Sequence, residues 1–277
     1  MGRGYNFEFL KDDLSLPAWL AVGAIGQVIV TLTAPAKYHL VPVGLTISIL
    51  TIDLITQLLG WQRNVYLKDA LIGRHSVLFP NEDGSRPEKM ADKPVAMFML
   101  GIRSNHPMGR LLPAYRKFNE YYEEIYADAE ANRATNGYLG RTPNWLNSEF
   151  GQNNTLCSTS YWRSMEDLEA FSRRPIHVKS MMFLNKTFFG ANGHTVGVMH
   201  EAMVCPPGHW EGIYGYVNRW GFAATKFPIG KNLGLRDPIW EKDPKVLNGM
   251  HGRMGSIVKQ AEMDAQLAKA VGELPQQ

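Results

Sequence analysis

The chain has 277 residues, of which 45% are hydrophobic and 20% are charged. This length and composition are typical of a folded protein with one sizeable domain and an accessory element. The formal charge of +3 is small and no basic run is interleaved with aromatic residues, so the sequence argues against a nucleic-acid partner.

The number and spacing of the cysteines and histidines argue against two further classes, disulfide-rich proteins and metal-binding proteins. The sequence holds only two cysteines, Cys157 and Cys205, which are too few for a disulfide framework. Neither a CxxC nor an HExxH pattern occurs, so no metal site is predicted. We expect both cysteines in the core.

After an N-terminal segment, 1–16, residues 17–62 contain two apolar runs. Each run is close to the roughly 20 residues that a helix needs to cross a bilayer. The sequence therefore predicts a membrane helical hairpin. The alternative is a pair of buried core helices, because the second run includes Asp53 and several threonines.

The charges around these runs predict their orientation. Arg63, Lys68 and Arg74 follow the second run, whereas the intervening loop carries only Lys37. By the positive-inside tendency the rest of the chain faces the cytosol, and the predicted location is the endoplasmic reticulum membrane. A cleaved signal peptide fits less well, because Glu8 and two aspartates precede the first run.

Residues 63–94 are rich in proline, glycine and charge, and we interpret them as a linker. A folded domain is predicted over 95–230, followed by a C-terminal tail with a helix over 231–277. The alternation and spacing of apolar residues in the domain predict these elements: a strand over 95–105, a helix over 109–133, a short strand over 137–140, a polar connection over 147–154, a strand over 155–162, a helix that Ser164 caps and Pro175 bends, and two strands over 194–217.

This order predicts an α+β fold with a four-stranded antiparallel sheet and helices on one face, in the ferredoxin-like manner. The strands are apolar on both faces, so the face without helices also needs a cover. A second copy of the chain supplies one, which predicts a homodimer that forms an α+β barrel around a cavity.

The stretch 194–228 combines polar and aromatic residues in a way that suits a small-molecule site. It reads as a hairpin whose turn contains Pro206, Pro207 and Gly208. Alternation along its first strand puts His200 and Glu201 on opposite faces, so one of them points into a cavity. The alternative is a core histidine and a glutamate that pairs with an arginine.

A further set of residues in the domain forms a recognisable pattern over about 95–228: Tyr161, Trp162, Arg163, Ser164, His177, Gly197, His200, Glu201, Trp210, Glu211, Ile213, Tyr214, Asn218 and Gly221. With this pattern the chain resembles a family of fungal and bacterial proteins catalogued as monooxygenase-like, of unknown function, in the dimeric α+β barrel superfamily. The resemblance implies a scaffold like that of the antibiotic-biosynthesis monooxygenases. The fungal members look like tailoring enzymes of secondary metabolism, while other members of the superfamily are haem-dependent enzymes or cyclases.

The first functional hypothesis is a monooxygenase that needs no cofactor and acts on a lipophilic terpenoid or polyketide intermediate from the membrane. No GxGxxG follows a strand, and no 2-His-1-carboxylate spacing is evident. Such an enzyme needs a base and a place for an oxyanion. We expect His200 or Glu201 as the base and Arg103 or Tyr214 beside the oxyanion. The expected substrate-binding residues are Trp162, Trp210, Glu211, Tyr214 and His177.

Three alternatives remain open. A cyclase or pericyclase of the Diels-Alderase kind uses the same aromatic cavity to fold a flexible substrate, without redox chemistry. A haem enzyme uses His177 as the axial ligand. An anchored scaffold subunit has no catalytic role, and its buried histidine and glutamate are structural.

Overall fold

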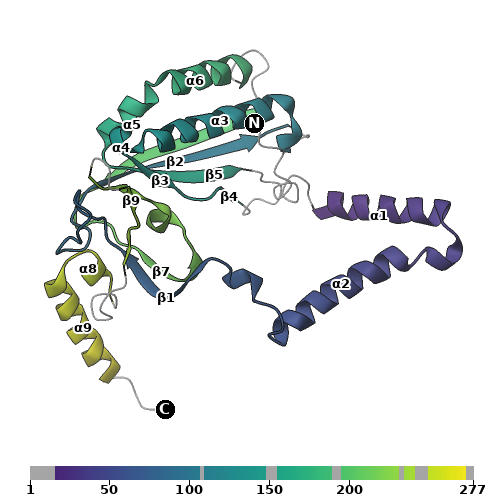
Figure 1. Ribbon diagram of the computed structural model, residues 1–277, viewed down its shortest axis with the longest axis horizontal. Coiled ribbons are helices and arrows are strands. Elements are labelled where there is room, and N and C mark those ends of the chain that lie inside the picture. The colour runs from purple at the N-terminus through teal and green to yellow at the C-terminus, as the bar shows by residue number, and fades with distance from the viewer. Residues whose placement is uncertain are drawn as a thin grey trace.

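The computed structural model describes residues 16–106, 109–147, 155–188, 195–230, 234–240 and 249–272. Figure 1 shows a helical hairpin at the N-terminal end, a layer of helices over a main sheet, and a smaller sheet on the other side. The expected N-terminal segment 1–16 and the polar connection 147–154 lie almost entirely outside the described residues.

The main sheet has the strand order β3-β5-β2-β6, with β4 also paired to β5, and every pairing in it is antiparallel. Its strands are β2 (Val95–Ser104), β3 (Tyr138–Arg141), β4 (Trp145–Leu146), β5 (Leu156–Trp162) and β6 (Val196–Cys205). Apart from the two-residue β4, the strands follow each other along the chain as β2, β3, β5 and β6. The first and third of these, β2 and β5, are the two central strands, as in the ferredoxin-like fold. The predicted α+β fold class is therefore confirmed for this chain, and the barrel stays a prediction.

Helices cover one face of this sheet (Figure 1). They are α3 (Pro113–Ala131), the short α4 (Arg133–Asn136), α5 (Met165–Ser172) and α6 (Pro175–Phe188), with the 3-10 turn η4 (Gly109–Leu111) before α3. The hydroxyl of Ser164 accepts a hydrogen bond from the Asp167 amide and so caps α5, as predicted. The helix is interrupted ahead of Pro175, which has no amide proton to donate.

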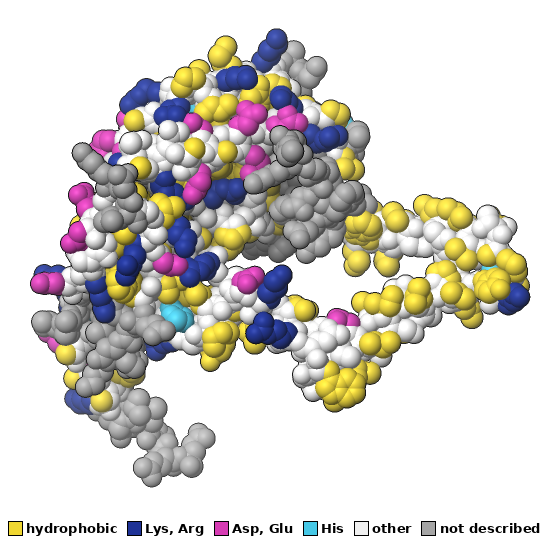
Figure 2. All heavy atoms as spheres, in the orientation of Figure 1, with side chains coloured by type: hydrophobic (Ala, Val, Ile, Leu, Met, Phe, Trp, Pro, Cys, Tyr) yellow, Lys and Arg dark blue, Asp and Glu magenta, His cyan; other side chains and the backbone are white. Residues whose placement is uncertain are grey.

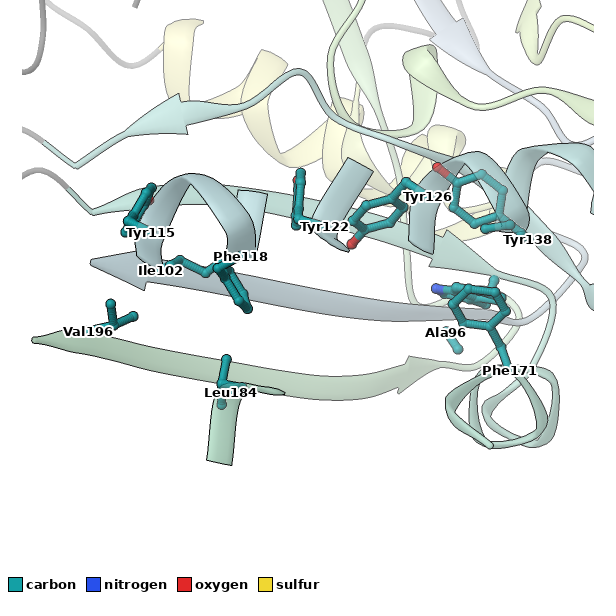
Figure 3. Close-up of a cluster of buried hydrophobic side chains, with 12 residues drawn as sticks. Ala96, Ile102, Tyr115, Phe118, Tyr122, Tyr126, Tyr138, Phe171, Leu184 and Val196 are labelled. Atoms are coloured by element: carbon teal, nitrogen blue, oxygen red, sulfur yellow. The ribbon is translucent and has the colours of Figure 1, made fainter. Parts of the chain in front are cut away.

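The core between helices and sheet is formed largely by one stripe of α3. Tyr115, Phe118, Tyr122, Tyr126 and Ala129 recur at spacings of three and four and are all buried. Figure 3 shows these buried side chains spread along β2, from Ile102 and Val196 at one end to Ala96 and Phe171 at the other, with Tyr122 between them.

The stretch 194–217 is not a hairpin, contrary to the prediction. Strand β6 pairs along its whole length with β2, whereas β7 (Ile213–Asn218) pairs with β1 (Ala70–Val77) in a separate sheet of order β10-β1-β7. The loop between them carries Trp210 into a second core. At the proline-glycine turn the chain therefore passes from the main sheet to the smaller sheet, and it does not fold back beside β6.

The segment 63–94 is not a plain linker, because it contains the 3-10 turn η3 (Val65–Leu67) and strand β1. Val77, Leu78 and Phe79, which end this strand and follow it, are at most 1% exposed. The prediction of a linker rested on the proline, glycine and charged residues after Phe79. It overlooked the apolar residues before them. The tail also contributes to the smaller sheet, since β10 (Ile239–Trp240) pairs with β1.

The second core covers one end of the sheet face that lacks helices. There Leu139, Met97 and Tyr161 of the main sheet pack under Phe79, Trp210 and further aromatic side chains. The covering layer also includes η5 (Gly221–Ala224) and β8 (Phe227–Pro228), which pairs with β9 (Leu235–Arg236). The last two helices described are α8 (Met250–Arg253) and α9 (Ile257–Gly272). On β6, the edge strand of this face, Met199 and Met203 are in register with Gly101 and Met97 and remain 42% and 43% exposed.

Helices α1 (Leu16–Thr33) and α2 (Val41–Leu58) contain no buried residue. They are joined through η2 (Ala36–Tyr38), extend away from the two sheets (Figure 1), and present a mostly hydrophobic surface (Figure 2). The spans Leu16–Thr33 and Ala36–Leu58 each have a mean hydropathy of 1.7 and are long enough to cross a membrane. The alternative of buried core helices is wrong.

Candidate functional site

Strand β6 carries the two residues that the sequence singled out, and it places them on opposite faces of the main sheet. His200 shares its face with Val196 and Val198, which pack against the helix-side core. Glu201 is in register with Met99 and faces the other way. His200 is therefore the member of the pair that lies on the helix-covered side.

A second histidine lies close to His200. His177, near the start of α6, is half-buried, and the proximity of His200 helps to hold its pKa below the ordinary value. Desolvation by burial is the larger cause of that shift. The carbonyl of Ser172 accepts a hydrogen bond from the His177 ring, so the other ring nitrogen is left as an acceptor. Both predicted histidines thus lie on the helix-covered side, where His200 is exposed and its charge acts on the half-buried His177, which is neutral at pH 7.

The floor beside the two histidines is apolar. The ring of Phe98 lies 5.3 Å from the ring of His200, and Leu100 is the register partner of His200. Phe98 and Leu100 are only half-buried although they lie on a central strand on the helix-covered face. On β2 they lie between Ala96 and Ile102, which mark the two ends of the cluster in Figure 3. Solvent therefore reaches the middle of this face next to His200.

Across the same face lies a polar cluster that the sequence analysis missed. The hydroxyl of Tyr122 is 2.8 Å from Asn144 Oδ1 and 2.7 Å from Ser158 Oγ. The guanidinium of Arg141 donates to Tyr122 at 3.2 Å and to Asn144 at 2.8 Å, and it lies over the ring of Tyr126 at 4.8 Å. Tyr122 and Tyr126 lie between α3 and the strands (Figure 3).

Burial controls the protonation of these tyrosines. It raises the pKa of Tyr122 and of Tyr126, so both hydroxyls keep their protons across the neutral range. The serines on one face of the buried strand β5, Ser158 and Ser160, are their partners. A signal was available in the sequence: hydroxyl residues alternate along an otherwise buried strand, while tyrosines recur on the facing helix.

The structure does not bring the other two predicted catalytic residues to this place. Glu201 and Arg103 share the face without helices, and both are exposed. Arg103 is four residues from Met99, the register partner of Glu201, which is roughly 13 Å along the strand. Neither can act together with His200, because the sheet lies between them.

Trp162 is on the helix-covered face but is only 1% exposed. Its indole nitrogen donates to Ser160 Oγ at 3.0 Å, and its ring packs on Tyr138 and Phe171. This side chain is part of the core and has no free surface for a ligand.

The remaining predicted binding residues lie in the second core. Trp210 stacks on Phe79 at 4.3 Å and donates to the carbonyl of Lys93. Tyr214 is buried, which raises its pKa, and its hydroxyl accepts from the amide of Ala223. The carboxylate of Glu211 forms an ion pair with the buried Arg253 of α8. These contacts join the C-terminal segment to the smaller sheet.

Among the described residues no group of three or more histidine, cysteine or carboxylate side chains could hold a metal ion. A shallow depression of about 420 Å³ lies over polar residues outside the two cores and touches none of the predicted site residues. It is lined by Asn81, Pro87, Glu88, Lys89 and Asp92. The candidate site is therefore the face beside His177 and His200.

Residues 95–222 match the family described as Monooxygenase af470-like, which confirms the resemblance seen in the sequence. The chain is 27% identical over 206 residues to Monooxygenase af470 of Aspergillus fumigatus, covering 74% of this chain and 73% of that protein.

Solved structures that resemble this chain include the following two. SnoaB, a cofactor-independent oxygenase from Streptomyces nogalater, is 11% identical and covers 39% of this chain and 90% of its own, with a TM-score of 0.26. A conserved protein of unknown function from Bacteroides thetaiotaomicron is 12% identical and covers 41% and 98%, with a TM-score of 0.29. Scores of this size carry no argument, so the fold rests on the strand order.

Proposed function

We propose that this protein is a membrane-anchored monooxygenase that needs no cofactor and that oxidises a lipophilic intermediate of secondary metabolism. The observation that carries the proposal is the pair formed by His177 and His200 beside the half-exposed Phe98 and Leu100. This pair lies within the region that matches a monooxygenase family. The relative named Monooxygenase af470 supports the same reaction class.

The reaction that suits this site starts with a proton transfer. His200 removes a proton from an acidic methylene group of the substrate, and the neutral His177 accepts a hydrogen bond from a substrate hydroxyl. The resulting carbanion reduces dioxygen, and the two combine to a hydroperoxide that loses water. In sum, the methylene group and one dioxygen molecule give a carbonyl group and one water molecule. The substrate supplies all the electrons, so no separate reductant is needed.

The hairpin of α1 and α2 supports membrane anchoring, because its polar side chains find partners inside it. Thr31 and Thr46 donate to the carbonyls four residues earlier, Gln27 donates to the carbonyl of His39 at 2.7 Å, and His39 bonds the carbonyl of Ala34. A hydrocarbon environment requires this internal satisfaction of polar groups. The anchor brings the site to the bilayer in which a terpenoid or polyketide intermediate dissolves.

A homodimer is part of the same proposal. The exposed methionines Met199 and Met203 leave part of the helix-free face uncovered, and a second copy of the chain would bury them.

Isotope labelling tests the reaction class. The host is grown under dioxygen labelled with oxygen-18, and the metabolite whose formation depends on this protein is analysed by high-resolution mass spectrometry. The proposal expects one labelled oxygen atom in the product that is absent when the gene is deleted. A product that depends on the protein but gains no oxygen from dioxygen would instead identify a cyclase. Normal product in a His177→Ala, His200→Ala double variant would support the scaffold role.

A further inference from the structure

An exposed apolar surface lies next to the point where the chain leaves α2. It consists of η3, the first residues of β1 and the last residues of β7, and we call it the ribbon surface. Its exposed side chains are Val65, Tyr66, Leu67, Ile72, Tyr216 and Val217. Register and packing bring them together, since Leu71 pairs with Val217 and η3 contacts β7.

The exposure of this surface is high for apolar residues. Tyr66 is 84% exposed, Tyr216 66% and Ile72 59%. Tyr216 also has a φ of 53°, a left-handed conformation that a side chain other than glycine rarely adopts, opposite the point where the register of β1 shifts. The fold therefore presents a large aromatic ring to the surroundings from a strained position in a strand.

The chain connection places this surface near the end of the proposed span. Six residues, 59–64, separate α2 from η3, and they reach at most about 20 Å when fully extended. Trp61, within this connection, is 75% exposed. Tryptophan and tyrosine side chains concentrate where a membrane protein crosses the boundary between hydrocarbon and headgroups. The exposed cations Arg63 and Lys68 flank the same surface and complement anionic headgroups.

We propose that the ribbon surface lies in the headgroup region of a bilayer containing anionic lipids, as a second contact beside the hairpin. The soluble domain is then docked on the membrane and not merely tethered to it. This inference rests on the insertion of α1 and α2 in the proposed function, and it adds that β1, β7 and η3 touch the same membrane.

Site-specific fluorescence in vesicles tests the contact. The full-length chain is reconstituted in phosphatidylcholine and phosphatidylserine vesicles whose acyl chains carry a quencher near the headgroup. A small environment-sensitive fluorophore is attached at Tyr216→Cys. Met182→Cys on α6 is the matched control, because Met182 is 68% exposed. The unsubstituted protein, treated identically, corrects for labelling at the half-buried Cys205.

Docking predicts that quenching at position 216 exceeds that at position 182 by about twofold or more, with a blue-shifted emission. The double substitution Arg63→Glu, Lys68→Glu should reduce this difference in the anionic vesicles. Equal quenching at positions 216 and 182 would overturn the inference. So would a blue shift in detergent that grows with protein concentration, because it would assign the surface to a second copy of the chain.

A label at Leu50→Cys, in the middle of α2, separates the two proposals when the quencher is placed near the ends of the acyl chains for this one position. If Leu50→Cys is quenched and Tyr216→Cys is not, the hairpin is inserted and only the docking is wrong. If neither position is quenched, the membrane anchor itself is wrong.

Discussion

At the scale of single residues, the proposed chemistry depends on the polar side chains of the helix-covered face, where His200 is exposed, His177 is half-buried, and Tyr122 and Tyr126 are buried. His177 is kept neutral by burial and by His200, whereas Tyr122 and Tyr126 are kept protonated by burial. The histidine pair offers a ring nitrogen that can accept a proton. The two tyrosines offer only hydroxyl donors, whose oxygens already have hydrogen-bond partners. This difference is why we assign the reaction to the histidines and a structural role to the tyrosines.

The polar cluster around Tyr122 should be important for stability. Replacing Tyr122 with Phe removes the hydroxyl that Asn144, Ser158 and Arg141 share. Leaving such buried groups with fewer partners should lower the free energy of unfolding by about 1–3 kcal/mol. Chemical denaturation of the detergent-solubilised full-length protein measures the change. Tyr66→Phe, at an exposed position, is the matched control and should have no effect; equal stability of both variants would contradict the structural role.

The pKa of His177 predicts a pH dependence of stability. Its folded-state pKa is lowered from 6.5, so the unfolded chain binds the proton more tightly than the folded protein. Stability should therefore be complete above pH 6.5 and should fall as the pH drops through the lowered pKa. Unfolding midpoints between pH 5 and pH 8 should show this fall in the wild type and a smaller fall in His177→Gln. An identical pH profile for both proteins would remove the basis for a neutral His177.

At the scale of elements, the sequence predicted the helices and strands in which apolar residues repeat regularly within one short stretch of chain. The strands β2 and β5 and the helix α3 follow from runs such as 95–105 and from the tyrosine stripe. The partners of β7 did not follow, because pairing with β1 joins segments about 140 residues apart and no local pattern encodes it. For the polar cluster around Tyr122 a local signal exists in the alternating hydroxyl residues of β5, but the cluster itself joins α3 to three other segments, and that joining is not encoded locally.

One junction between elements depends on a glycine. Gly137 has a φ of 73° at the end of α4, and a Cβ there would come within 2.1 Å of the Asp167 carboxylate. Gly137→Ala should therefore destabilise the protein by more than the roughly 1–2 kcal/mol expected from left-handed strain alone. Gly234→Ala is the control, because Gly234 has a φ of 90° but open space around it. Thermal unfolding should rank the two, and equal losses would mean that the α4–α5 contact is not tight.

At the scale of the whole molecule, three parts have separate tasks in this account. Under the proposed function, the hairpin of α1 and α2 would anchor the chain and the ferredoxin-like unit would carry the site. The smaller sheet covers one end of the helix-free face. The sequence predicted the first two. It did not reveal that the chain covers part of this face itself, because the covering residues come from the segments interpreted as a linker and a tail.

The part of that face left uncovered predicts self-association. Met203 is 43% exposed on β6, so Met203→Glu would place a charge in the proposed dimer interface. Sedimentation in detergent should give a dimer for the wild type and a monomer for Met203→Glu. Met182→Glu on α6 is the control and should remain a dimer. A monomeric wild type at all concentrations would contradict the dimer.

The most direct test of the central claim is high-resolution mass spectrometry of the metabolites from a host carrying His200→Ala, beside the wild type. Loss of a general base lowers a rate by typically about 10²–10⁴-fold, so the substrate should accumulate. The account predicts an accumulating compound that has one oxygen atom fewer and two hydrogen atoms more than the normal product. An accumulating isomer of the product would contradict it and would show that the protein is a cyclase.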